Sequence, residues 1–182
     1  FGMIGRLVEQ KGIDMVVEII PELMKTLSQM VILGNGHPHY EKKLSEMSSR
    51  YPGRLSVHIG FDEGLAHIIE AGSDFFLMPS AFEPCGLNQM ISMQYATLPI
   101  VTGVGGLKDT VEALGEGKHP CGLRVGSSDK DALLSGVLQA FSLYTEEKQL
   151  VISMRKNAME KNVGWEISAR QYMHIYQKIV RF

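Results

Sequence analysis

The stretch Phe75–Gln89, FFLMPSAFEPCGLNQ, is the clearest indication of the fold in this sequence. It begins with four apolar residues, turns at Pro79 and Ser80, and continues through Phe82–Gln89 into a helical pattern. A short, continuous apolar run closed by proline is typical of a buried parallel strand. A strand followed directly by a helix is the repeating unit of α/β proteins.

Further short apolar runs predict strands at Gly2–Gly5, Met30–Gly34, Val57–Gly60, Pro99–Gly103 and Gly122–Val125. Helical patterns lie between the strands, at Ile13–Thr26, Tyr40–Ser49, Glu63–Ala71, Leu87–Tyr95 and Leu107–Ala113. This alternation predicts an α/β fold with a Rossmann-like, doubly wound parallel sheet, in which ligands bind beyond the carboxyl ends of the strands. C-terminal helices without intervening strands are predicted at 129–144, 146–161 and 165–182.

Size and charge restrict the possible functions. The 182 residues suit one domain, and 45% hydrophobic residues suffice for a sizeable core. A net charge of −2 argues against a protein that binds nucleic acid by neutralising phosphates. No apolar stretch reaches the roughly 20 residues of a membrane span. The two cysteines, Cys85 and Cys121, have no metal-binding spacing and favour a reducing compartment.

The segment Phe82–Gln89 is the strongest candidate site. Glu83 follows a predicted central strand, and Gly86 and Leu87 would offer free N–H groups at the start of a helix, where an anion binds well. A carboxylate beside a phosphate site suggests recognition of a sugar hydroxyl. An ordinary loop with a solvated glutamate is an equally open interpretation.

The segment Gly5–Gly12, GRLVEQKG, carries two cations beside the first predicted turn. Arg6 offers a bidentate fork and Lys11 a point charge, which together suit a diphosphate. The alternative is a pair of solvated surface cations, the usual situation of Lys and Arg.

The glycine pair Gly105-Gly106 follows a predicted strand and would permit close backbone approach to a ligand, although a plain tight turn explains it equally well. For Asp129-Lys130-Asp131, helix capping is favoured over metal binding, and His37 and His39 are interpreted as loop residues. The stripe of apolar residues on the last helix predicts a packing face, made of Tyr172, Met173, Ile175, Tyr176 and Ile179.

Taken together, four segments resemble the C-terminal, donor-binding domain of bacterial glycogen synthases and plant starch synthases. These segments are Gly5–Gly12, Ile59–Phe61, Pro79–Leu87 and Gly105–Val111, and the resemblance extends from about Gly5 to about Tyr176. The family consists of retaining glucosyltransferases of the GT-B type, which have two Rossmann-like domains. The resemblance therefore implies that residues 1–182 form a nucleotide-sugar-binding domain.

The implied reaction transfers glucose from ADP-glucose to the non-reducing end of an α-1,4-glucan with retention, without a metal or other cofactor. Arg6 and Lys11 would bind the diphosphate and stabilise the leaving nucleotide, and Glu83 would hydrogen-bond the glucose. The donor-binding positions implied by the resemblance are Gly60, Phe61, Cys85, Gly86, Leu87, Asn88, Gly105 and Gly106.

Some positions depart from the family pattern. Ala81 stands where the family often has Arg, Val104 where it often has Thr, and Phe61 where it usually has a base-stacking Tyr. Asn88 lies at a position that varies. Related glycosyltransferases carry a second Glu eight residues after the first, where this chain has Ile91, which favours the glycogen and starch synthase branch.

The family's N-terminal acceptor domain is absent from this sequence, so we expect the chain to be inactive alone and its helices at about 146–182 to pack toward that domain. The expected partners are ADP-glucose or ADP, the glucan acceptor and the N-terminal domain, with no nucleic acid or membrane. Two alternatives remain, another nucleotide-sugar glycosyltransferase and a non-catalytic nucleotide- or glucan-binding module. The resemblance implies a cytoplasmic location in a bacterium and the plastid stroma in a plant or alga.

Overall fold

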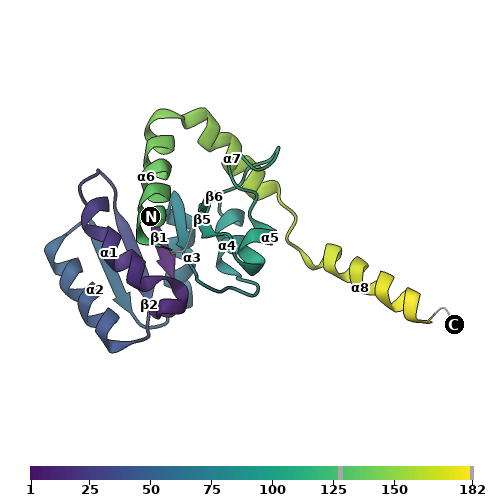
Figure 1. Cartoon of the computed structure of the whole chain (residues 1–182), viewed down its shortest axis with the longest axis horizontal. Helices are drawn as coiled ribbons and strands as arrows, with labels where there is room; N and C mark the ends of the chain where they lie inside the picture. Colours follow the sequence, from purple (N-terminus) through teal and green to yellow (C-terminus); the bar gives the residue numbers. More distant parts are fainter. Residues whose placement is uncertain (127–128, 181–182) are drawn as a thin grey trace.

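A computed structural model describes residues 1–126 and 129–180, and its centre is one parallel sheet (Figure 1). The strands run in the order β3-β2-β1-β4-β5-β6, and every neighbouring pair is parallel. Their bounds are β1 Gly2–Ile4, β2 Met30–Gly34, β3 Leu55–Ile59, β4 Phe75–Met78, β5 Leu98–Thr102 and β6 Leu123–Val125. The predicted strands and the Rossmann-like sheet are therefore confirmed.

Helices cover both faces of this sheet. The first part of the chain contributes α1 Ile13–Leu23, α2 Pro38–Arg50, α3 Glu63–Gly72, α4 Asn88–Gln94 and α5 Gly105–Thr110, with a short 3₁₀ helix η1 at Glu9–Lys11. The last part contributes α6 Lys130–Glu146, α7 Lys148–Glu160 and α8 Trp165–Val180. In Figure 1, α1, α2 and α6 lie on one side of the strands and α4, α5 and α7 on the other.

The strand order contains a reversal between β1 and β4. From β1 the chain proceeds through β2 to β3, then crosses back to β4 on the other side of β1 and continues outward to β6. In doubly wound sheets, such a reversal opens a crevice at the carboxyl ends of the two adjacent strands, and ligands bind there. The segments that follow β1 and β4 contain the two strongest candidate motifs.

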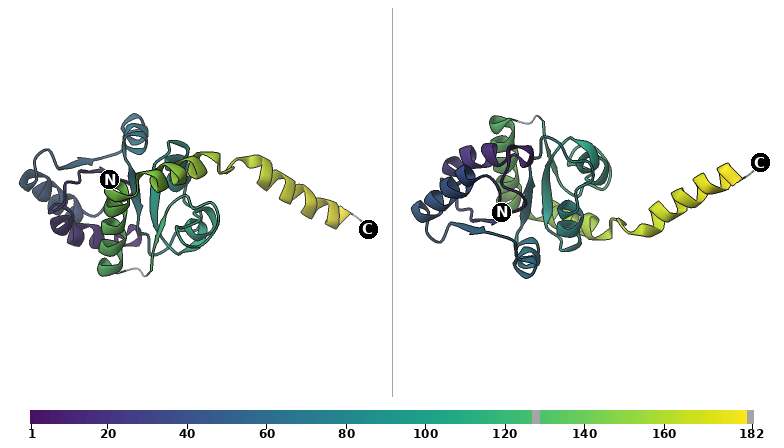
Figure 2. Two further views of the ribbon diagram at one scale, coloured as in Figure 1. Left: turned by 90° about the horizontal axis from the view of Figure 1, so that it is seen from above. Right: turned by 90° about the horizontal axis from the view of Figure 1, so that it is seen from below.

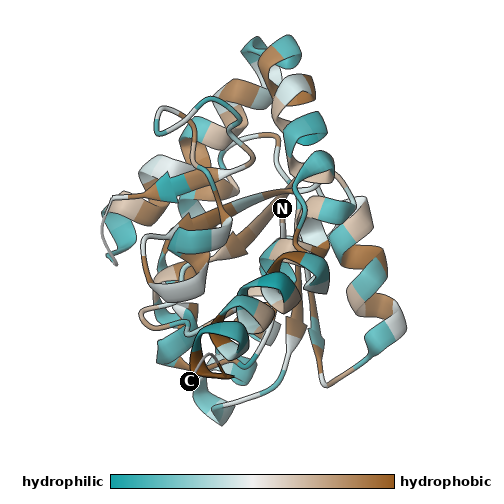
Figure 3. Cartoon of the chain, turned by 90° about the vertical axis from the view of Figure 1, so that its right-hand side faces the viewer, coloured by the Kyte–Doolittle hydropathy of each residue, from teal (hydrophilic) through white to brown (hydrophobic). Residues whose placement is uncertain are grey.

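The core consists of the apolar strands and the helix faces that cover them. Phe76 on β4 and Ile32 on β2 are fully buried, as are Val16 and Ile20 on α1. Figure 3 shows the strands mostly in the brown of hydrophobic residues, whereas the helices alternate between brown and teal. Strands that are apolar on both faces require cover on both faces, which explains the two helical layers.

Hydrogen bonds at the starts of α6 and α2 show that two polar motifs cap helices. The Asp129 carboxylate accepts a hydrogen bond from the Ala132 N–H at 2.9 Å and caps α6, so the capping interpretation is confirmed. His37 caps α2 through its Nδ1, which accepts from the His39 N–H at 3.2 Å. Within residues 1–126 and 129–180, no group of three or more His, Cys, Asp or Glu side chains could hold a metal ion.

The bounds of one predicted helix need correction. The helix predicted at Leu107–Ala113 spans Gly105–Thr110 instead, because the glycine pair forms its first turn rather than the turn before it. Packing of the helices at about 146–182 toward an N-terminal domain stays a prediction, and the two described helices in that range differ within this domain. Helix α7 buries Val151 and Met154 and packs against α4 and β5, so it belongs to this domain.

Only α8 extends away from the domain, as both views of Figure 2 show. It has no buried residue, and its apolar stripe, which includes Tyr172 and Tyr176, is exposed. The stripe was predicted to be a packing face, and in the described part of the chain nothing covers it. None of the described helices is long and apolar enough to cross a membrane.

Candidate functional site

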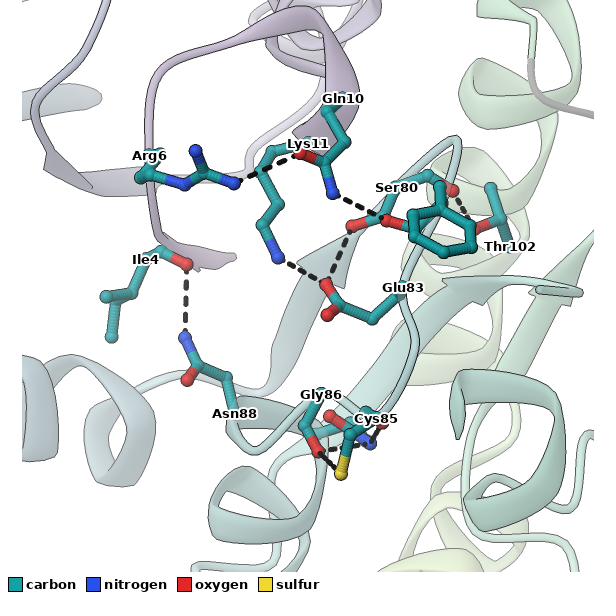
Figure 4. Close-up of polar contacts among 12 residues, drawn as sticks. Ile4, Arg6, Gln10, Lys11, Ser80, Glu83, Cys85, Gly86, Asn88 and Thr102 are labelled. Atoms are coloured by element: carbon teal, nitrogen blue, oxygen red, sulfur yellow. Dashed lines mark hydrogen bonds and ion pairs between the residues drawn. The ribbon is translucent and has the colours of Figure 1, made fainter. Parts of the chain in front are cut away.

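An ion pair joins the two candidate motifs at the reversal of the sheet. The Lys11 ammonium, at the end of η1, contacts Oε2 of Glu83 in the loop after β4 (Figure 4). The two residues are 72 positions apart in the chain. Their side chains are 23% and 8% exposed, so the pair is largely withdrawn from water. The interpretation of Lys11 and Glu83 as solvated surface charges is therefore wrong.

Two buried hydroxyls fix the position of Glu83. The Ser80 hydroxyl donates to the Glu83 carboxylate at 3.3 Å, and the Thr102 hydroxyl at the end of β5 donates to the Ser80 carbonyl at 2.5 Å. Both residues are almost fully buried. A carboxylate that accepts bonds from neighbours held in this way is pre-organised for a ligand, because its orientation is set before the ligand arrives.

Arg6 lies on the solvent side of this pair. It follows β1, its side chain is exposed, and its Nη2 donates to Oε1 of Gln10 at 3.0 Å. The Gln10 amide donates in turn to the Phe82 carbonyl at 3.2 Å. Figure 4 shows Arg6, Gln10 and Lys11 together on the same side of Glu83. The structure thus brings the three predicted catalytic residues into one region.

A cavity of about 290 Å³ opens beside these residues, at the carboxyl ends of β1 and β4. Its lining includes Gly5, Lys11, Glu83, Gly86, Leu87 and Asn88. Both members of the buried ion pair, Lys11 and Glu83, therefore line the cavity. Arg6 does not line the cavity, and its side chain is exposed and bonded to Gln10.

The loop between Glu83 and Asn88 forms one wall of the cavity. Gly86 has φ +71°, a conformation that side chains disfavour, and so it allows the loop to turn toward α4. Helix α4 begins at Asn88, with Leu87 as its N-cap, one residue later than predicted. Leu87 is 63% exposed, and Cys85 is exposed and unpaired. Asn88 uses its side-chain N–H₂ to bind the Ile4 carbonyl at 3.1 Å, which fixes α4 to β1.

The glycine pair has a structural role that the sequence did not reveal. Gly106 donates its N–H to the Glu83 carbonyl at 3.0 Å, and a Cβ on either glycine would collide with the backbone of Glu83 or Cys85. The observed close approach is therefore to the loop that carries Glu83, and neither glycine lines the cavity. A direct contact of Gly105 or Gly106 with a donor stays a prediction.

Gly60 and Phe61 lie away from the ion pair. They follow β3, the edge strand, and neither lines the cavity. Phe61 is 89% exposed and its ring is free to stack on a planar group. Gly60 has φ +140° and lets the chain leave the strand at this point.

Sequence reasoning missed several residues that build the site. Gln10 and Ser80 lie inside the motifs already singled out, and Thr102 lies at the end of a predicted strand. A fourth, Gln89, is fully buried and donates to the carbonyls of Cys85 and Gly86 at 3.0 Å. The type and position of these polar residues were visible, but the partners of Gln10 and Thr102 lie 72 and 22 positions away in the chain. The partners of Ser80 and Gln89 in these bonds are nearby in the chain, and the fold of the loop after β4 decides them.

Among the titratable groups outside the site whose pKa is shifted are two buried side chains, Glu70 and Cys121. Burial raises the pKa of the Glu70 carboxyl on α3, although the neighbouring His67 opposes the shift. Burial likewise raises the pKa of the Cys121 thiol. Both shifts follow from the cost of placing a charge in an apolar environment.

The chain is similar to glycogen and starch synthases over almost its entire length. It is 50% identical to the glycogen synthase of Cellvibrio japonicus, over 98% of this chain and 37% of that protein. It also matches the catalytic domain of starch synthase IV from Arabidopsis thaliana, solved with ADP and acarbose, at 30% identity and a TM-score of 0.88. That match covers 97% of this chain and 37% of the other. The predicted resemblance to glycogen and starch synthases is confirmed.

A second solved structure supports the fold. The C-terminal domain of a group 1 glycosyl transferase from Francisella tularensis matches with a TM-score of 0.69 at 18% identity, over 88% of this chain and 83% of that domain. The chain spans a little over a third of the length of the glycogen synthases that it matches. The family model for group 1 glycosyl transferases matches residues 1–142, which include all six described strands, and the chain therefore belongs to this family.

Proposed function

We propose that this chain is the donor-binding domain of a glycogen synthase, which transfers glucose from ADP-glucose to an α-1,4-glucan with retention. The observation that carries the proposal is the Lys11–Glu83 pair at the reversal of the sheet, with Arg6 beside it. A cation for phosphate and a carboxylate for sugar hydroxyls stand next to each other there, as binding of a nucleotide sugar requires.

The order of the segments along the carboxyl edge of the sheet suits an extended nucleotide-sugar donor. We propose that the glucose lies near Glu83 after β4 and the diphosphate near Arg6 and Lys11 after β1. Phe61 follows β3, which is three strand spacings, or about 14 Å, from β4. Its exposed ring would then receive the nucleotide base. The starch synthase match, solved with ADP, supports nucleotide binding by the chain.

The chemistry follows from the charges. Negative charge grows on the diphosphate as the bond to glucose breaks, and cations fixed in advance stabilise that charge without reorganising. An ammonium has three N–H donors, so Lys11 can keep one on Glu83 and offer another to a phosphate oxygen. In this proposal the cations take the place of a metal ion, and Glu83 holds the glucose by hydrogen bonds.

Calorimetric titration of the chain with ADP and UDP tests nucleotide binding. We expect ADP to bind more tightly than UDP, and the double variant Arg6→Ala, Lys11→Ala to weaken ADP binding by roughly 100-fold or more. The matched control is Lys42→Ala, Lys43→Ala, which removes two exposed cations of α2 outside the site. Equal ADP affinity in the two double variants would refute the assignment of Arg6 and Lys11.

Turnover needs the partner domain. We expect glucose transfer from ADP-glucose to glycogen only when the chain is joined to the N-terminal half of a glycogen synthase, because the acceptor must be held against the donor. Loss of transfer in the joined protein on Glu83→Ala, with ADP binding retained, would place Glu83 at the sugar. Transfer from UDP-glucose alone would instead indicate another glycosyltransferase of the same fold.

A further inference from the structure

We propose that Gln10 is a positioning residue that holds Arg6 at a set distance from Glu83, and so places the diphosphate relative to the sugar. This inference rests on the proposed function. Gln10 lies on η1, next to Lys11, and no role follows for it from the residue type alone.

Gln10 connects the two loops of the site through three hydrogen bonds. Its carbonyl accepts from the Ala81 N–H at 3.0 Å, and its side-chain N–H₂ donates to the Phe82 carbonyl at 3.2 Å. Its side-chain oxygen accepts from Arg6 at 3.0 Å. The first two bonds fix η1 to the residues just before Glu83, and the third extends this connection to Arg6 (Figure 4).

The two side-chain bonds require a side chain that both accepts and donates. Arg6 only donates and a carbonyl only accepts, so one group must accept and donate at once, and glutamine does both. In the described part of the chain, Gln10 is the one hydrogen-bond partner of the Arg6 side chain. Arg6 is otherwise exposed, and an exposed arginine samples many rotamers. Gln10 therefore restricts Arg6 before the nucleotide binds, which is the function of a positioning residue.

A double-mutant cycle measures this role. Gln10→Met keeps the length of the side chain and removes both of its hydrogen bonds. We expect about tenfold weaker ADP binding, the effect of losing one hydrogen bond to a charged group. In an Arg6→Ala protein, the change Gln10→Met should alter ADP affinity by less than about twofold, because the arginine that Gln10 positions has been removed. The control Gln139→Met changes an exposed glutamine of α6 and should leave ADP affinity unchanged.

Two results would overturn the proposal. One is an unchanged ADP affinity in Gln10→Met. The other is an equal loss in both backgrounds, which would show that Gln10 supports the fold of the loops and does not act through Arg6.

A second measurement needs no nucleotide. The ¹⁵N heteronuclear NOE of the Arg6 side-chain Nε–H reports its mobility, and we expect a lower NOE in Gln10→Met than in the wild type and in Gln139→Met. An equal NOE in all three proteins would refute the positioning role. If the wild-type chain binds no ADP, nucleotide binding by this domain alone is disproved, and the NOE still decides the role of Gln10.

Discussion

Replacing Gly106 by alanine should displace the loop that carries Glu83, although Gly106 does not line the cavity. The new Cβ would lie 2.6 Å from both the Cα and the carbonyl carbon of Cys85, and closer still to its oxygen. Ordinary contacts begin at 3.4 Å, so the Cys85 oxygen, which would lie 2.0 Å from the new Cβ, must move by about 1.4 Å. The loop resists this movement because Gly106 binds the Glu83 carbonyl and Gln89 binds the Cys85 carbonyl.

The expected cost has two parts. Overpacking of a fixed interior site costs about 1–3 kcal/mol, and a weakened hydrogen bond adds about 1 kcal/mol. We therefore expect Gly106→Ala to lower the free energy of unfolding by about 2–4 kcal/mol, which moves the urea midpoint down by roughly 1–2 M. Because the displaced loop carries Glu83, binding of a nucleotide sugar should weaken more than binding of ADP.

The matched control is Gly72→Ala at the end of α3. An added Cβ there meets nothing within 4 Å, so its stability should stay the same or rise slightly. Far-UV circular dichroism in urea is the suitable assay, since the single tryptophan, Trp165, is exposed on α8 and reports little about the core. A Gly106→Ala variant within about 0.5 kcal/mol of the control, which is the range of neutral surface changes, with unchanged ligand binding, would refute the reasoning.

Three further predictions concern charge and thiol chemistry. Burial raises the pKa of Glu70 above its ordinary 4.5, so the folded state loses stability as the pH rises through that raised pKa, and Glu70→Gln should be more stable than wild type at pH 7 but not at pH 4 in urea titrations. A pH-independent difference would contradict this sign. Lys11→Met should cost about 1–3 kcal/mol by leaving Glu83 buried without its cation, and adding Glu83→Gln should recover part of the loss in the same assay. A thiol reagent should titrate the exposed Cys85 in the native chain and the buried Cys121 only after unfolding, and fast labelling of both would show that the core opens.

The order of strands and helices was accessible from the sequence because it depends on local patterns. Continuous apolar runs such as Met30–Gly34 and Phe75–Met78 require cover on both faces, and the periodic stretch at Ile13–Leu23 provides it. The charges of Arg6, Lys11 and Glu83 could be recognised as candidates, since each follows the end of a predicted strand. Helix boundaries were less accessible, because Gly105 and Gly106 serve equally well in a turn and in the first turn of a helix.

Only the tertiary structure decided which of these charges meet. Residues 72 positions apart become partners because β1 and β4 are neighbours at the reversal of the sheet, and no local pattern specifies that neighbourhood. The same arrangement makes Gln10 a bridge to Phe82 and places Gly106 against the loop of Glu83. The sequence by itself thus determined the secondary structure and the candidate charges. The pairing of those charges came from long-range packing, in which each contact depends on the placement of the whole sheet.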